Sequence, residues 1–152
     1  MSRRVLYLNG PNINMLGKRE PHIYGRTSLA DIEAAVRRRA AELNITIDFR
    51  QTNEQGELVT WIQQAREGAD LIILNAGAYT HTSVAVHDAL NAAEKPVIEL
   101  HLSNNFRRED FRHLSYVSTA ARGIIEGFGA QGYLNALEAA ARLLDRPDGG
   151  LS

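Results

Sequence analysis

Glu99 and His101 are the residues in this sequence whose spacing points most directly to acid–base chemistry. They belong to a strand-like run that begins at Val97, and residues two apart on a strand face the same way. A carboxylate beside an imidazole can fix its tautomer and hold it protonated, which prepares the histidine to act as a general acid. The alternative is a solvated strand face, although an unpaired glutamate would be costly if this strand is buried.

Asn75 and His81 follow a second strand-like segment, the unbroken apolar run 71–74. Ligands of open α/β sheets bind just beyond the carboxyl ends of the strands, so both side chains lie where a substrate is expected. Taken alone, His81 is better explained as a core histidine or as a residue at the entry to a helix. Either Thr82 or Ser83 can cap that helix.

Tyr24 lies in a long polar loop, residues 12–26, together with the cations Lys18, Arg19 and Arg26. The phenol has a pKa near 10, and a nearby cation can lower the pKa of an acid by roughly 1–3 units. A tyrosinate base is therefore within reach of neutral pH, although Tyr24 can equally be an aromatic side chain packed against the domain. A loop of this length is uncommon unless it is a lid or a binding loop, so we predict that the segment from Arg19 to Arg26 is a mobile lid that a ligand orders.

Other polar residues near the strand ends have two interpretations each. Asn9, Asn12 and Asn14 can simply form the turn after the first strand, or they can supply polar groups to a site. Arg108 and Arg112, four residues apart, can form an exposed helical face or provide cations for an anionic substrate.

Metal and Schiff-base chemistry find little support in the residue pattern. The chain has five histidines, but they form no HExxH motif and no carboxylate–histidine spacing typical of a metal site. The lysines are Lys18, in the polar loop, and Lys95, at the amino end of a strand and so at the wrong edge of the sheet. We therefore expect no metal and no cofactor.

These residues are positioned by strands that alternate with amphipathic helices, which is typical of a parallel sheet built from βαβ units. The strand-like runs are 5–8, 45–49, 71–74, 97–100 and 124–125. Right-handed crossovers then favour a three-layer, flavodoxin-like α/β fold with a five-stranded parallel sheet in the order 2-1-3-4-5. The apolar and polar residues of the second strand alternate, which predicts a half-exposed edge strand.

Length and composition limit the possible classes of protein. A chain of 152 residues suits one domain, and we expect a catalytic domain over residues 1–144 and a flexible tail over 145–152. The net charge of −1 argues against binding to nucleic acid or to a membrane surface. The absence of cysteine excludes thiol nucleophiles, disulfides and thiolate metal sites. Because no apolar stretch resembles a signal or a membrane span, we expect a cytoplasmic protein.

Two other functions fit the same fold but not these residues. A flavin carrier would need a phosphate loop rich in Ser, Thr and Gly after the first strand, where this chain has Asn9-Gly10-Pro11-Asn12. A phospho-receiver or interaction module would have acidic residues there and an aspartate at the end of the third strand, where Asn75 stands.

Five segments in the same order resemble type II 3-dehydroquinate dehydratase. They are Leu8-Asn9-Gly10-Pro11-Asn12, Arg19-Glu20-Pro21 with Ile23-Tyr24-Gly25, Asn75 through Ala78 to Ser83, Glu99 to Asn104, and a last group made of Phe111-Arg112, Ser115 to Ser118 and Gly127 to Tyr133. The resemblance covers about residues 4–140. The departures are mild, namely Ile13 and Met15 in place of leucines and Gln55 in place of a glutamate.

The resemblance implies a lyase of the shikimate pathway that removes water from 3-dehydroquinate to give 3-dehydroshikimate. It implies that Tyr24, as a tyrosinate favoured by Arg19, takes a proton alpha to the ketone. Asn12 would stabilise the enolate, and His101, oriented by Glu99, would protonate the departing hydroxyl.

The same resemblance implies how the substrate is held. Backbone amides at Leu102 and Ser103 would receive the substrate carboxylate, at a strand end whose geometry favours an anion. His81 and Arg112 would bind the ring hydroxyls, and Asn75 would lie beside the catalytic histidine.

The resemblance also implies an assembly. Enzymes of this family form dodecamers built from trimers, and Asp88 would reach into the site of a neighbouring subunit. The partners that we expect are therefore a small-molecule substrate and further copies of the chain.

Overall fold

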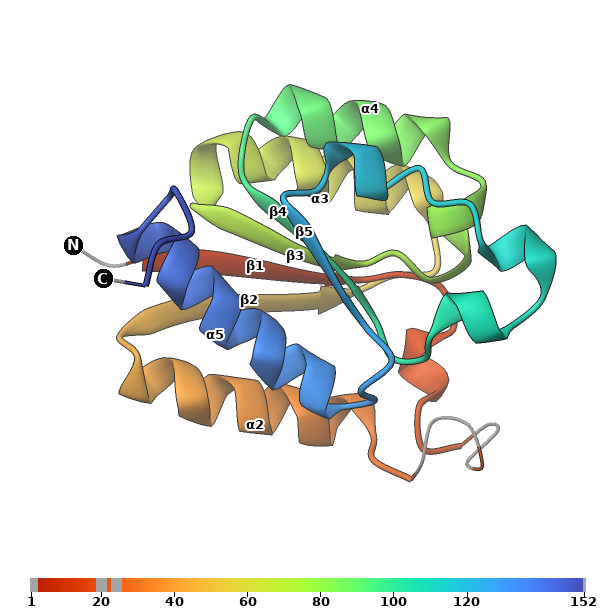
Figure 1. Ribbon diagram of the computed structural model, residues 1–152, viewed down its shortest axis with the longest axis horizontal. Helices are drawn as coiled ribbons and strands as arrows, with labels where there is room; N and C mark the ends of the chain where they lie inside the picture. The colour runs from red at the N-terminus through yellow and green to blue at the C-terminus, as the bar shows by residue number, and fades with distance from the viewer. Residues whose placement is uncertain (1–2, 19–21, 23–25, 152) are drawn as a thin grey trace.

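The described residues form a five-stranded parallel sheet with helices on both faces (Figure 1). The computed structural model describes residues 3–18, 22 and 26–151. The strands are β1 (Arg3–Asn9), β2 (Ile45–Gln51), β3 (Leu71–Asn75), β4 (Val97–His101) and β5 (Gly123–Glu126). The α-helices are α2 (Leu29–Glu42), α3 (Gln55–Gly68), α4 (Val84–Ala93) and α5 (Gln131–Asp145). Short 3-10 helices are η1 (Ile13–Met15), η2 (Gly77–His81), η3 (Asn105–Arg107), η4 (Asp110–Arg112) and η5 (Ser118–Ala120).

The strand order is β2-β1-β3-β4-β5, and every neighbouring pair is parallel, which confirms the predicted fold class. β2 is an edge strand, as its alternation predicted: Ile45 and Ile47 are buried, whereas Thr46 and Asp48 are exposed. Because all five strands run the same way, their carboxyl ends gather at one edge of the sheet.

Two apolar layers hold the helices to the sheet. Helices α2 and α5 cover one face and helices α3 and α4 the other, as Figure 1 shows. The rings of Tyr7 of β1, Phe49 of β2 and Tyr133 of α5 form a cluster in which the centroids are 5.4 to 6.2 Å apart. None of the helices in the described part of the chain has the length and hydropathy needed to cross a bilayer.

Local hydrogen bonds account for where the helices begin. Ser28 and Asp31 form a capping box, with each side chain accepting from the other residue's backbone N–H. For α4 the sequence left two candidates, and Ser83 is the cap, since its hydroxyl accepts from Val86 N–H at 2.9 Å. Helix α5 continues to Asp145, one residue past the predicted end of the domain, and the flexibility of the tail stays a prediction.

A close backbone approach at Gly10 holds the ends of β1 and β3 together. Its N–H donates to the carbonyl of Asn75 at 2.8 Å, and a Cβ at this position would lie 2.3 Å from the carbonyl oxygen of Ala76. Only glycine fits such a contact without moving the backbone. The pairing of β1 with β3 then brings Asn9 alongside Asn75 at the carboxyl edge.

Candidate active site

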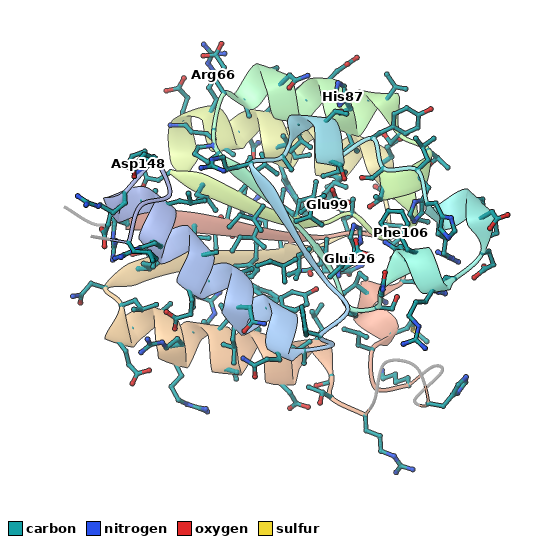
Figure 2. All side chains as sticks on the ribbon, in the orientation of Figure 1. Arg66, His87, Glu99, Phe106, Glu126 and Asp148 are labelled. Atoms are coloured by element: carbon teal, nitrogen blue, oxygen red, sulfur yellow. The ribbon has the colours of Figure 1, made fainter. Side chains whose placement is uncertain are left out.

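A cavity of about 170 Å³ opens beyond the carboxyl ends of β1, β3 and β4, where a ligand was expected. Figure 2 labels Glu99 and Glu126 near the ends of β4 and β5. The predicted site residues in the cavity wall are Asn12, Asn75, His81, His101, Leu102, Ser103 and Arg112. Residues separated by as many as a hundred positions in the chain therefore share one cavity.

Glu99 and His101 form a buried hydrogen-bonded pair behind the cavity wall. Nε2 of His101 lies 2.5 Å from Oε2 of Glu99, and the two residues are 6% and 1% exposed. Because a carboxylate only accepts, Nε2 carries the hydrogen of this bond. Among the described residues, none makes a hydrogen bond to Nδ1 of His101, so this nitrogen is the one available to a ligand.

The Glu99 carboxylate is held ionised by its neighbours. Burial by itself would raise its pKa, but the side-chain hydrogen bonds from His101, Ser118 and Ser115, together with the positive charge of protonated His101, outweigh burial and lower the pKa. Glu99 therefore stays negative near neutral pH and accepts the hydrogen on Nε2 of His101.

His81 enters the cavity as a hydrogen-bond acceptor. Its Nδ1 lies 2.7 Å from the carbonyl oxygen of Leu114, so Nδ1 carries the hydrogen and Nε2 is unprotonated in the neutral ring. Burial lowers the pKa of His81, and although the bond to Leu114 opposes this, the charges of His101 and Arg112 lower it further. A neutral His81 can accept a hydrogen bond from a hydroxyl group in the cavity.

Asn75 is oriented by a buried polar network beneath the cavity. Its amide nitrogen donates to the hydroxyl of Tyr133 at 3.0 Å, and that hydroxyl donates to Oδ1 of Asn9 at 2.5 Å. Oδ1 of Asn75 accepts from Gly77 N–H at 3.3 Å. Tyr133 is fully buried, and burial raises the pKa of its phenol, so it remains a neutral donor. The network fixes the orientation of the Asn75 side-chain amide at the cavity.

Arginine side chains line one side of the cavity. Arg108 and Arg112 both line it, and they share the carboxylate of Glu109, at 3.8 Å from Arg108 Nε and 3.3 Å from Arg112 Nε. Arg108 also donates from Nη1 to Oγ of Ser103 at 3.4 Å, so guanidinium groups lie beside Leu102 and Ser103 in the cavity wall. Both arginines line the cavity, and their role as cations for an anionic substrate stays a prediction.

One predicted residue lies away from the cavity, and two lie outside the described residues. Asp88 is exposed on α4 and does not line the cavity of its own chain. Tyr24 and Arg19, the predicted base and its activating cation, lie outside the described residues. Asn12 adopts a left-handed backbone with φ of 69°, and its N–H donates to Oδ1 of Asn53 at 3.0 Å, so it forms a turn as well as part of the wall.

Several contributors were missed at the sequence level. Asn105 lines the cavity and is 7% exposed, but an asparagine in the loop after a strand carries no pattern that marks it as part of a site. Ser115, Ser118 and Tyr133 belong to segments already quoted for their family resemblance, yet no role was assigned to them. A signal did exist, because a glutamate on a buried strand requires hydrogen-bond donors from elsewhere in the chain.

Within the described residues, no group of three or more His, Cys, Asp or Glu side chains is placed to hold a metal ion. The cavity is therefore described by its hydrogen-bonding and charged groups alone. Those groups are an imidazole paired with a carboxylate, a second imidazole, amides, and guanidinium groups.

Comparison with known families shows to which family the chain belongs. Residues 3–141 match the model of the family described as dehydroquinase class II. The chain belongs to this family. Proteins named 3-dehydroquinate dehydratase from Brucella canis and Brucella suis are each 54% identical to it over 143 residues, covering 94% of this chain and 91% of theirs. The family resemblance inferred from the sequence is thus confirmed, and it replaces the flavin-carrier and phospho-receiver alternatives.

Solved structures of class II dehydroquinases share the fold. The type II dehydroquinase from Propionibacterium acnes matches with a TM-score of 0.89 at 41% identity, covering 93% of this chain and 97% of that one. The type II dehydroquinase from Butyrivibrio crossotus matches with a TM-score of 0.87 at 38% identity, covering 90% and 96%. The flavodoxin-like arrangement of this chain is therefore the one found in the family.

The Tyr133 network predicts an unequal cost for two tyrosine variants. Tyr133→Phe leaves Oδ1 of Asn9 and the amide of Asn75 without their buried partner, so we expect the free energy of unfolding to fall by about 1–3 kcal/mol. Tyr79→Phe removes a hydroxyl that bonds to Asn53 in an exposed setting, and it should cost less than about 1 kcal/mol. Urea denaturation of both variants at one protein concentration measures the difference, and equal losses would contradict the role of the network.

The lowered pKa of His81 predicts its titration. Imidazole nitrogen NMR should show His81 gaining its second proton below the ordinary histidine range, which is centred near 6.5. Because the folded pKa is depressed, the stability that His81 contributes is fully present above about pH 6.5 and is lost as the pH falls through the folded pKa. His81→Gln assigns the signal, and a midpoint above 6.5 would refute the prediction.

Proposed function

We propose that this protein dehydrates 3-dehydroquinate to 3-dehydroshikimate, acting as a hydro-lyase of the shikimate pathway. Membership of the class II dehydroquinase family supports the reaction, as do the relatives that carry the name 3-dehydroquinate dehydratase. The observation that carries the proposal is the buried Glu99–His101 pair at the wall of the cavity. Such a pair supplies the acid that the loss of a hydroxyl group requires.

His101 acts as the general acid in this proposal. Glu99 accepts the hydrogen on Nε2, so the proton given to the substrate is the one on Nδ1 of the imidazolium. When the carbon–oxygen bond beta to the ketone breaks, this proton goes to the departing hydroxyl, which leaves as water. The negative charge of Glu99 lies against Nε2 and complements the positive charge of the imidazolium before the transfer.

Tyr24 acts as the base, as the resemblance implies, with Arg19 favouring its phenolate. The phenolate takes the proton alpha to the ketone, and the electron pair of the broken C–H bond moves into the enolate. Asn12, in the cavity wall, helps to stabilise the enolate oxygen. The enolate then expels the hydroxyl that His101 protonates, so one proton leaves the ring at carbon and another is supplied at oxygen.

The remaining wall residues bind the substrate. The backbone of Leu102 and Ser103 receives the carboxylate on the side of the cavity that Arg108 and Arg112 line. His81 accepts a hydrogen bond from a ring hydroxyl through its unprotonated Nε2, and Arg112 donates to another. Asn75, oriented from below by Tyr133, contacts the ring beside His101. In this arrangement the neutral imidazole of His81 accepts a hydrogen bond, and the charged guanidinium of Arg112 donates one.

We also propose a domain organisation, a cellular location and an oligomeric state for this enzyme. Residues 1–144 form the catalytic domain, and residues 145–152 form a flexible tail. The enzyme acts in the cytoplasm, and fractionation of the source cells tests this location.

The enzyme assembles as a dodecamer of trimers in which Asp88 reaches a neighbouring site. The exposed position of Asp88 on α4, away from the cavity of its own chain, supports this assignment.

Incubation with 3-dehydroquinate should produce the ultraviolet absorbance of the conjugated product, and this activity should survive borohydride and a chelator.

Removal of a general acid or base typically costs about 10²–10⁴-fold in rate, so His101→Ala and Tyr24→Phe should each lower kcat by that order with little change in KM. Tyr79→Phe is the control, because its hydroxyl contacts Asn53 outside the cavity. Unchanged kcat would remove the substituted residue from its role, and no product from the wild type would overturn the function.

Asp88→Asn tests the assembly. Loss of the carboxylate should reduce both the sedimentation mass and kcat, because each site would lack a group supplied by another subunit. Glu67→Gln, at an exposed position on α3, is the matched control and should alter neither quantity. Full activity from a monomeric wild-type protein would contradict the shared site.

A further inference from the structure

The Glu99 carboxylate has partners beyond His101, and they come from a distant loop. Ser115 Oγ donates to Oε2 of Glu99 at 2.8 Å, and Ser118 Oγ donates to Oε1. Glu99 is 1% exposed, so these hydroxyls are its replacement for water. Both carboxylate oxygens are therefore occupied, and Oε2 is shared between Ser115 and His101.

The backbone fixes the direction in which Ser115 donates. Its hydroxyl oxygen accepts from the N–H groups of Val117 at 3.2 Å and Ser118 at 3.0 Å. A serine hydroxyl has two acceptor lone pairs and a single proton. With both lone pairs engaged, that proton is left for Glu99, so the hydroxyl acts only as a donor to the carboxylate.

The loop that carries the serines is itself anchored. Tyr116 N–H donates to the carbonyl of Thr80 at 2.8 Å, and Nδ1 of His87 donates to the carbonyl of Tyr116 at 2.8 Å. Val117, between the two serines, is buried against the layer formed by α3 and α4. The serine hydroxyls are thus held at the carboxylate by contacts that do not involve it.

We propose that Ser115 and Ser118 are positioning residues that keep the Glu99 carboxylate ionised and aimed at Nε2 of His101, so that Nδ1 presents the proton used in the elimination. The inference rests on the proposed function for its kinetic consequences and on the geometry for its structural ones. Neither serine lines the cavity, so each acts through Glu99 and not on the substrate.

Any test must distinguish the effects of the serines from those of other charged groups near the Glu99–His101 pair. They are His81 of η2, Arg112 of η4, Arg108 beside η3 and Glu126 of β5, which pairs in register with His101. Glu126 accepts from Asn105 N–H at 3.0 Å. None of them is altered by a serine substitution, so a matched serine series isolates the effect on Glu99.

The test compares Ser115→Ala, Ser118→Ala and the double variant with Thr119→Ala. Thr119 is the matched control, because it adjoins Ser118 and its hydroxyl contacts His87 rather than Glu99. Losing a hydrogen bond to a charged group should lower kcat on the order of 10-fold for each serine, with KM nearly unchanged. The acidic limb of the kcat profile should move to higher pH, since Glu99 loses donors that favour its ionised form.

Epistasis and NMR make the proposal falsifiable. In a Glu99→Gln background the serine variants should lose no further activity, and in the wild-type background the ¹³C carboxyl titration of Glu99 should shift to higher pH. Equal kcat losses in both backgrounds, an unshifted Glu99 titration, or an equal effect of Thr119→Ala would overturn the proposal.

Two further variants separate folding and function from the role of the serines. Ser115 also accepts from the backbone, so if its alanine variant fails to fold, Ser118→Ala carries the test and Ser118→Thr should restore activity. If the wild type does not dehydrate 3-dehydroquinate, the proposed function fails, while the Glu99 titration still decides whether the serines hold the carboxylate.

Discussion

A negative charge buried beneath the cavity is the constraint on which the candidate site depends. Glu99 lies on an internal strand, where an unpaired carboxylate would be strongly destabilising. Hydrogen bonds from His101, Ser115 and Ser118 satisfy it, and they join a strand to a loop that follows it in the chain. The same interactions that make the charge tolerable also set the tautomer of the histidine, so stability and proposed catalysis share one group of atoms.

The parallel sheet determines why the other groups reach this pair. Three neighbouring strands, β1, β3 and β4, end at one edge, and each delivers a polar residue there: Asn9, Asn75 and His101. The glycine contact after β1 keeps the first two ends together, and the tyrosine hydroxyl beneath them orients the amide. The cavity therefore has a hydrogen-bonded floor, while the arginines around η3 and η4 line another side of it.

Elements governed by local rules were predictable. The capping box at Ser28 depends on residues three apart, the edge position of β2 on alternation, and the Glu99–His101 pair on the two-residue period of a strand. Where two neighbours satisfied the same rule, the sequence could not choose between them: only the structure shows that Ser83, rather than Thr82, caps α4.

By itself, the sequence determined the fold class, the strand order, the family, and the pairing of carboxylate and imidazole, because each rests on a short period or on ordered motifs. Only the tertiary structure decided that Ser115 and Ser118 donate to Glu99, that Tyr133 orients Asn75, and that two arginines share a wall with His81. These contacts join residues far apart in the chain. Their geometry depends on how loops close over the sheet, and no spacing along the sequence encodes that.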